Sequence, residues 1–137
     1  MAKNTWSNWS GVATSNPTRI AQPSSEGEVQ EIIRTAAESA GRVKAVGAGH
    51  SFTSVAQTDG TLVNLDNLSR LVEFNKDKMT VTLRAGTRLR DVPDLLRPLG
   101  VAFANQGDVD PQSVVGAIST GTHGTGANFT LLSLIHI

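Results

Sequence analysis

Two segments of the sequence combine glycines, hydroxyl side chains and a histidine, which are residue types suited to binding a phosphate group. The first, VGAGHSF, covers residues 46–52 and places His50 directly after two closely spaced glycines. The second, GDVDPQSVVGAISTGTHGTG, covers residues 107–126 and surrounds His123. Glycine lets the backbone approach a ligand closely, and successive N–H groups in such a turn form an anion-binding nest. Both segments therefore predict contact with an anionic ligand.

Neither segment matches a standard nucleotide-binding or hydrolase motif. A dinucleotide fingerprint needs a third glycine where Phe52 stands, and the Gly-Lys-Ser/Thr of a Walker loop is absent. No Gly-x-Ser-x-Gly element indicates a serine hydrolase. A lone GxG is also typical of an ordinary turn after a strand, so both interpretations stay open for the first segment. The second segment is the stronger candidate because it packs glycines and hydroxyls around His123.

The histidines and aspartates of these segments also have ordinary structural explanations. His50 and His123 can each contact a backbone carbonyl, and Asp108 and Asp110 can cap a turn before Pro111. Zinc binding by the two histidines with Asp108 is conceivable, but the spacing matches no familiar ligand pattern. We therefore expect no metal.

Composition restricts the class of protein. The chain has 137 residues, 39% of them hydrophobic and 18% charged, which is typical of one globular domain. The net charge is zero, so nothing indicates nucleic-acid binding. Cysteine is absent, which excludes disulfides and cysteine-based metal sites. No signal-like or membrane-spanning run is visible, and we expect a cytoplasmic protein.

One helix and several short strands are expected to position the first segment. Ser25 and Glu28 fit a capping box at the start of the helix, and Gly41 fits a left-handed stop at its end. The apolar face of this helix comprises Val29, Ile32, Ile33, Ala36, Ala37 and Ala40. Residues 1–18 are expected to form an irregular lead-in in which the two tryptophans only pack. Three strands are expected, at 19–21, 43–46 and 62–65.

The second half of the chain is expected to begin with a hairpin. The alternating strand at 79–85 pairs with a strand at 71–75. Thr87 or Asp91 caps a second helix, in which Pro93 forces a late start or a kink. Because this hairpin is antiparallel and helices do not alternate strictly with strands, the pattern favours an α+β fold.

Four stretches, taken in order, resemble the N-terminal part of FAD-linked oxidases of the vanillyl-alcohol-oxidase superfamily. They are NWSG at 8–11, VGAGHSF at 46–52, NLDNL at 64–68 and the long segment at 107–126. The resemblance is most specific for sugar-1,4-lactone oxidases, such as gulonolactone and arabinonolactone oxidases, with alditol oxidases second. It implies an α+β, PCMH-type FAD-binding domain with a mixed sheet and flanking helices, of which residues 1–131 form the incomplete N-terminal part.

The resemblance implies FAD as the cofactor and assigns its binding residues. In such enzymes the first glycine loop holds the FAD pyrophosphate, and the histidine at the position of His50 is bonded to the flavin 8α carbon. Some relatives have another residue there and bind FAD noncovalently. The implied cofactor-binding residues are Val46, Gly47, Ala48, Gly49, His50, Ser51, Phe52, Gly107, Asp108, Ser113, Gly116, Ala117, Thr120, Gly121, Thr122 and His123.

The implied activity is that of an FAD-dependent oxidoreductase acting on CH–OH groups. Hydride passes from a sugar-lactone or polyol carbon to flavin N5, and oxygen or another acceptor reoxidises the flavin. In the relatives, substrate-binding residues lie mostly in a C-terminal cap domain that this chain lacks. We therefore assign no catalytic residue and expect the chain alone to be inactive and marginally stable. The alternatives are a noncovalent FAD- or nucleotide-binding module without oxidase activity, and a plain structural domain.

The last six residues, LSLIHI at 132–137, match a translation of the mosaic-end adaptor used in transposase-based sequencing libraries. We expect the authentic coding sequence to stop near Thr130 or Leu131. The alternative is a genuine apolar C-terminal strand.

Overall fold

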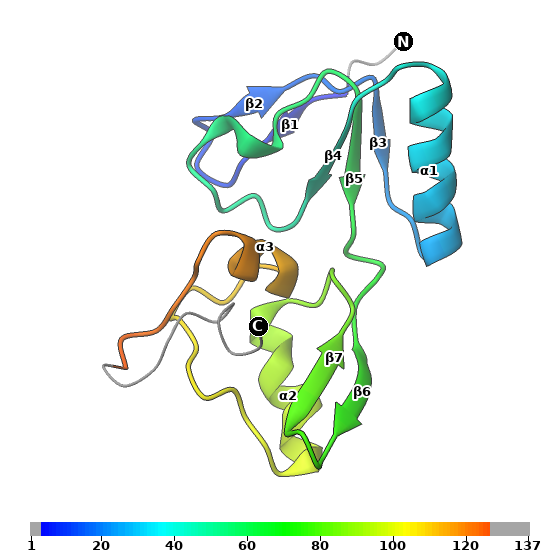
Figure 1. The fold of residues 1–137 in the computed structure, drawn as a ribbon. Helices are drawn as coiled ribbons and strands as arrows, with labels where there is room; N and C mark the ends of the chain where they lie inside the picture. The colour runs from blue at the N-terminus through cyan, green and yellow to red at the C-terminus, as the bar shows by residue number, and fades with distance from the viewer. Residues whose placement is uncertain (1–3, 127–137) are drawn as a thin grey trace. The chain divides into compact units, whose positions relative to one another are not determined.

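The computed structural model describes residues 4–126, and the chain forms two compact units that divide after Leu68 (Figure 1). Both units combine helices with strands, so the predicted α+β class is confirmed. The prediction of an adaptor-derived tail at 132–137 lies outside the described residues, as does the predicted end of the coding sequence.

The first unit is built on a three-stranded parallel sheet with the strand order β3-β5-β4. Helix α1 connects β3 to β4, because parallel strands need a crossover connection. The central strand buries both Leu62 and Val63, which lie on opposite faces, so the sheet is covered on both sides. The elements are β3 (Arg19–Ala21), α1 (Glu26–Glu38), β4 (Val43–Val46), the 3₁₀ turn η1 (Ser54–Ala56) and β5 (Thr61–Asn64).

Helix α1 lies beside the sheet and supplies one layer of the core (Figure 1). Its Ile32 packs with Ala21 of β3 and Val63 of β5 in one buried cluster. The predicted apolar face is only partly used, since Ile32 and Ala36 are buried while Ile33 stays 53% exposed. Full burial of an aliphatic side chain stabilises a fold by about 1.5–3 kcal/mol, so Ile32 is the main anchor of the helix.

The helix begins as predicted, with one difference in its capping box. The Ser25 hydroxyl accepts a hydrogen bond from the Glu28 backbone N–H at 3.2 Å. The Glu28 carboxylate reaches one residue further than expected and accepts from the backbone N–H and hydroxyl of Ser24, at 2.8 Å and 3.0 Å. The reciprocal cap therefore also orders the chain just before the helix.

The end of the helix differs from the prediction. Ala40, not Gly41, adopts the left-handed conformation, with φ of +50°. The Gly41 N–H donates to the Ala36 carbonyl at 2.7 Å and the Ala40 N–H to the Ala37 carbonyl at 3.1 Å, which is a Schellman motif. A Cβ on Gly41 would lie 3.3 Å from the Ala36 carbonyl oxygen. Gly41 therefore allows the chain to pass close to the Ala36 carbonyl, and Ala40 before it is the left-handed residue.

The lead-in contains a short antiparallel pair that the sequence did not predict. The strands β1 (Trp6–Ser7) and β2 (Thr14–Ser15) align Trp6 with Ser15. The prediction of an irregular segment is wrong here. Strands of two residues are too short to show the alternation on which strand prediction depends.

The second unit begins with the predicted hairpin of β6 (Leu71–Asn75) and β7 (Thr80–Leu83). The pairing is antiparallel, with a register irregularity between Leu71 and Glu73. The second strand was expected to begin at Met79, but this residue lies in the turn with φ of +51° and is 61% exposed. The turn thus takes up a residue whose hydrophobicity alone had assigned it to the strand.

The second helix is split into short pieces, η2 (Leu89–Asp91), α2 (Val92–Leu96) and η3 (Arg97–Leu99). Pro93 lies in the first turn of α2, so the predicted late start is confirmed. Neither predicted cap acts as one, because the Asp91 side chain makes no capping bond and the Thr87 hydroxyl accepts from the Arg70 backbone N–H at 2.9 Å.

The core of the second unit centres on Leu89 and Ala117, both fully buried, with Phe103 and Val114 packed against them. Ala117 belongs to the last helix, α3 (Val114–Ser119). Within residues 4–126, no helix combines the length and the hydropathy that crossing a bilayer requires.

Candidate functional site

The first glycine loop starts where β4 ends, at the buried residue Val46. Gly49 in this loop has φ of +67°, a conformation that strains residues with a Cβ. A Cβ at this position would lie 3.4 Å from the Trp6 ring and 3.6 Å from the Asn8 Cα, which is ordinary van der Waals contact. Glycine is therefore needed here chiefly for its backbone conformation.

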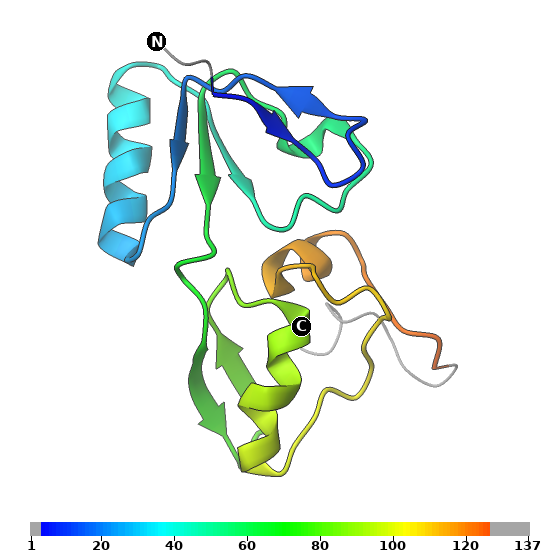
Figure 2. The same cartoon turned by 180° about the vertical axis from the view of Figure 1, so that it is seen from behind.

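The Asn8–Trp9 dipeptide binds three consecutive carbonyl groups of this loop. The Trp9 backbone N–H donates to the Gly49 carbonyl at 3.1 Å, and the indole Nε1 donates to the His50 carbonyl at 3.2 Å. The Asn8 side-chain amide donates to the Ser51 carbonyl at 2.9 Å. The loop after β4 accordingly lies beside the connection between β1 and β2 in both views (Figures 1 and 2).

The amide groups of the same loop stay available. Within residues 4–126, the backbone N–H groups of Ala48, Gly49 and His50 donate to no protein acceptor. Because the carbonyls of Gly49, His50 and Ser51 are already bonded, this part of the loop offers a ligand mainly N–H donors. Such an arrangement favours an anion, since backbone N–H dipoles carry partial positive charge.

Asn8 and Trp9 are site residues that the sequence reasoning did not identify. Asn8 is only 4% exposed, and its side-chain oxygen accepts from the Ala13 backbone N–H at 3.1 Å. The Trp9 ring stacks on the His50 imidazole, with centroids 5.1 Å apart and an angle of 22° between the planes. The prediction that Trp9 only packs is therefore wrong. The NWSG stretch was a signal for this role, because it belonged to the family resemblance.

The second segment is organised around the short helix α3 by local hydrogen bonds, and residues 110–114 before and at its start are bonded to residues 87–90. Ser113 is 2% exposed, and its hydroxyl accepts from the Gly116 backbone N–H at 3.3 Å as the N-cap. After the helix, Gly121 has φ of +68°, and the Thr122 backbone N–H donates to the Ala117 carbonyl at 3.1 Å. The hydroxyl-rich sequence thus largely serves to cap and close the helix.

Two stretches of the second segment approach each other closely. A Cβ on Gly107 would lie 3.0 Å from the His123 carbonyl oxygen. A Cβ on Gly124 would overlap the Asn105 side chain and lie 2.6 Å from the Gln106 carbonyl oxygen. Glycine is needed at these positions for space. The His123 Nδ1 lies 2.9 Å from the Gly124 carbonyl, the ordinary contact that the sequence allowed for.

The predicted cofactor-binding residues form two groups, one in each compact unit. The structure brings Val46–Phe52 together with Asn8–Trp9 in the first unit. It gathers Gly107–His123 around α3 in the second unit. Within the second group, Ser113 is buried and Asp108 is exposed.

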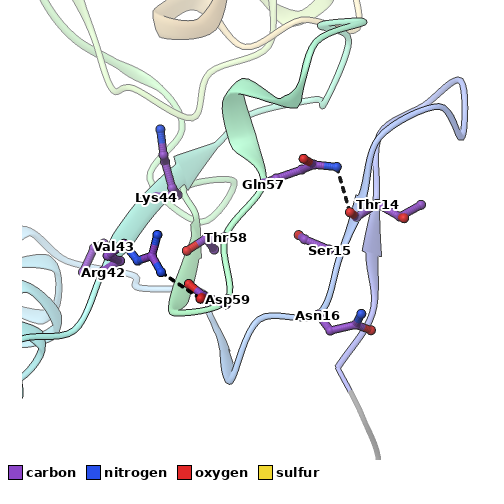
Figure 3. Close-up of a pocket in the computed structure, with 9 residues that line it drawn as sticks. All are labelled: Thr14, Ser15, Asn16, Arg42, Val43, Lys44, Gln57, Thr58 and Asp59. Atoms are coloured by element: carbon purple, nitrogen blue, oxygen red, sulfur yellow. Dashed lines mark hydrogen bonds and ion pairs between the residues drawn. The ribbon is translucent and has the colours of Figure 1, made fainter.

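A cavity of about 560 Å³ also opens in the first unit, and the glycine loop does not line it (Figure 3). Two of its interactions are a hydrogen bond from the Gln57 side chain to the Thr14 carbonyl and an ion pair of Arg42 with Asp59, both at 2.8 Å. None of its lining residues belongs to the predicted site. They are Thr14, Ser15, Asn16, Arg42, Val43, Lys44, Gln57, Thr58 and Asp59.

The described residues contain no clustered metal ligands. In the part of the chain that the structure describes, no three His, Asp or Glu side chains come together in a group that could hold a metal ion. The glycine loop and the segment around α3 are therefore the features whose chemistry needs an explanation.

Comparison with protein families and characterised proteins gives a consistent result. A family model described as "FAD binding domain" matches residues 17–133. An L-gulono-1,4-lactone dehydrogenase of Mycobacterium tuberculosis is 44% identical over 128 residues, which are 93% of this chain and 30% of the relative. A D-arabinono-1,4-lactone oxidase of Kluyveromyces lactis is 40% identical, covering 92% of this chain and 25% of the relative. The chain thus spans less than a third of the length of these relatives.

Solved structures with a similar fold include cholesterol oxidases. The enzyme from B. sterolicum superposes with a TM-score of 0.72 at 19% sequence identity, over 90% of this chain and 24% of that protein. A solvent-stable cholesterol oxidase gives a TM-score of 0.76, with the same identity and coverage. At this identity the likeness establishes a shared fold.

Proposed function

The chain belongs to the FAD binding domain family, and from this premise we propose that its first glycine loop holds the pyrophosphate of FAD in an oxidoreductase acting on CH–OH groups. The observation that carries the proposal is the loop itself. Its three carbonyls are bonded by Asn8 and Trp9, while the amides of Ala48, Gly49 and His50 have no protein acceptor among the described residues.

The pyrophosphate fits this donor set on electrostatic grounds. The chain has no net charge, and His50 is the only ionisable side chain between Gly47 and Phe52. A doubly charged anion in such a loop must be held by backbone dipoles, which the free amides supply.

His50 is proposed as the residue that bonds covalently to the flavin. Neither of its ring nitrogens forms a hydrogen bond to another residue within 4–126, so a nitrogen is available as a nucleophile. FAD, when bound, supplies the acceptor for the two electrons and hydrogen removed from an alcohol carbon. The described residues bind and orient the cofactor, and no catalytic residue is assigned among them.

The substrate proposed is a sugar 1,4-lactone, with an alditol as the second choice. Support comes from the names of the relatives, which are L-gulono-1,4-lactone dehydrogenase in Mycobacterium tuberculosis and L-gulonolactone oxidase in Mus musculus. These names differ in the electron acceptor that they imply, so oxygen and another acceptor both belong to the proposal. We expect this chain alone to show no turnover, because it spans 30% or less of these relatives.

The test uses the whole protein that contains this chain, purified from flavin-replete cells. The protein is precipitated with acid, and flavin fluorescence is measured in the pellet and the supernatant for wild type and His50→Ala. Fluorescence in the wild-type pellet and not in the variant pellet is the expected result. Flavin released from both would leave noncovalent binding by the glycine loop as the function, and a protein without flavin would contradict the proposal.

A further inference from the structure

Trp9 contacts His50 in two ways and contributes little to the core. Its indole Nε1 donates to the His50 carbonyl at 3.2 Å, and its ring stacks on the imidazole at a centroid separation of 5.1 Å. The side chain nevertheless stays 57% exposed. A large aromatic ring left this exposed is a poor contribution to folding, which directs attention to what the ring holds.

The backbone next to Trp9 is held in place by the side-chain hydrogen bonds of Asn8. The buried Asn8 side chain donates to the Ser10 hydroxyl at 3.0 Å and to the Ser51 carbonyl at 2.9 Å, and accepts from the Ala13 N–H at 3.1 Å. Two of these hydrogen bonds order residues 8–13 locally, and the one to the Ser51 carbonyl ties this segment to the loop around His50. The indole is therefore attached to a rigid support rather than to a free chain end.

The two contacts together restrict the histidine more than either would alone. The hydrogen bond fixes the His50 backbone, and the stack, with 22° between the ring planes, limits rotation of the imidazole about its side-chain bonds. Phe52 meets the Trp9 ring edge-on at 5.5 Å and restrains it from a second side. An imidazole held in this way presents its unbonded ring nitrogens in a defined direction.

We infer that Trp9 is a positioning residue, which orients the His50 imidazole for bond formation with the flavin 8α carbon. This inference rests on the proposed function. In the reaction, the imidazole loses its N–H proton and the 8α methyl carbon loses one hydrogen as a proton. The new carbon–nitrogen bond leaves two electrons and two protons on the flavin. Dioxygen takes these up and becomes hydrogen peroxide.

The test measures covalent attachment separately from total flavin binding. The whole protein is produced without flavin, incubated with FAD and oxygen, and sampled over time. Covalent flavin is read as fluorescence that stays with the protein on a denaturing gel, and total flavin as absorbance after desalting. The variants are Trp9→Leu, which lacks a ring, and Trp9→Phe, which keeps a ring but lacks the indole donor. Val12→Ala is the control, since Val12 is 70% exposed in the same segment.

For Trp9→Leu we expect covalent attachment to be roughly 10- to 100-fold slower than in wild type, because misorientation of reacting groups costs rates of this order. Total flavin should stay within about twofold of wild type, because the amides of the loop and the Asn8 tether are intact. Trp9→Phe should recover most of the rate, and Val12→Ala should match wild type.

Three results would overturn the positioning role of the Trp9 ring. Attachment by Trp9→Leu at the wild-type rate would show that the stack is not needed. Parallel loss of total and covalent flavin would show that Trp9 only maintains the fold. Trp9→Phe being as slow as Trp9→Leu would show that the ring stack does not position the imidazole. Wild-type protein that binds FAD without covalent attachment would instead contradict the proposed role of His50, and with it the role of Trp9.

Discussion

The two glycine-rich segments resemble each other in sequence, and each contains a left-handed glycine, Gly49 or Gly121, but the second also needs glycine for space. In the first, Gly49 takes φ of +67° and a Cβ would meet only ordinary contacts. In the second, a Cβ on Gly124 would overlap the Gln106 carbonyl oxygen at 2.6 Å, and a Cβ on Gly107 would make a tight contact with the His123 carbonyl oxygen at 3.0 Å. The first loop is held by Asn8 and Trp9, about forty residues earlier in the chain, whereas the second is held mainly by backbone bonds with residues 87–90 and by local bonds around α3.

The two histidines differ in the same way. His123 is engaged with the Gly124 carbonyl at 2.9 Å, as a loop histidine often is. His50 is stacked on Trp9 and leaves its ring nitrogens without a partner among residues 4–126. A histidine directly after a glycine turn is therefore not informative by type alone. What distinguishes His50 is the stacked Trp9 ring and the hydrogen bond from the Trp9 indole to its carbonyl.

The largest effect is expected for Gly124→Ala. The new Cβ would meet the Gln106 carbonyl oxygen at 2.6 Å, and a backbone group cannot move away cheaply. We expect destabilisation of about 1–3 kcal/mol, measured as a lower denaturant midpoint of the whole protein. Gly27→Ala is the control, because a Cβ there lies 3.9 Å from its nearest neighbour inside α1. Equal stability of the two variants would contradict the close approach.

At Gly49 we expect the stability of variants to depend on how well the new residue tolerates a left-handed backbone, and not on the size of its side chain. Gly49→Ala should cost about 1–2 kcal/mol, the strain of a left-handed alanine. Gly49→Asn should cost less, since asparagine tolerates this region. Gly11→Ala, with φ of +76° and open space around the Cβ, reports the strain alone. If Gly49→Asn proves worse than Gly49→Ala in a thermal melt, space and not conformation governs this loop.

The cost of a left-handed residue with a Cβ can also be measured at Ala40, by removing the Cβ and not by adding one. This residue ends α1 with φ of +50° in a place that usually carries glycine. We expect Ala40→Gly to raise stability by up to about 1 kcal/mol, because it removes strain of that order. An unchanged or lower melting temperature would show that the helix end relaxes without cost, and would weaken the estimate for Gly49.

The smallest effect is expected on the exposed face of α1. A hydrogen bond from Arg34 at 3.0 Å, together with its charge, lowers the pKa of the Glu31 carboxyl below 4.5. A lowered pKa adds stability above pH 4.5 that is lost as the pH falls through the folded-state value. Arg34→Ala should therefore lower the melting temperature slightly at pH 7, and the two proteins should converge well below pH 4.5. A difference that persists in strong acid would exclude this pair as its cause.

Local signals in the sequence predicted much of the fold. The cap at Ser25, the strands at 43–46 and 71–75 and the late helix start at Pro93 each depend on neighbouring residues. The failures involve choices between nearby residues or very short elements. Ala40 replaces Gly41 as the left-handed residue because the close contact with the Ala36 carbonyl reserves the glycine for space.

The candidate site was predicted less completely than the family. The resemblance to FAD-linked oxidases and the PCMH-type fold class are confirmed by the family match and the structural likeness. Asn8 and Trp9 were missed as site residues because their partners lie about forty residues away, and no periodicity records such a contact. The individual cofactor-binding residues stay predictions.

The most direct test of the central claim is peptide mapping of the flavin in the whole protein. After denaturation and trypsin digestion, mass spectrometry locates the flavin. Cleavage after Lys44 and Arg70 releases a peptide in which His50 is the only histidine, and His123 lies on another peptide. We predict the mass of the flavin on the peptide from Ala45 to Arg70. Flavin on the peptide with His123, or on none, would contradict the account.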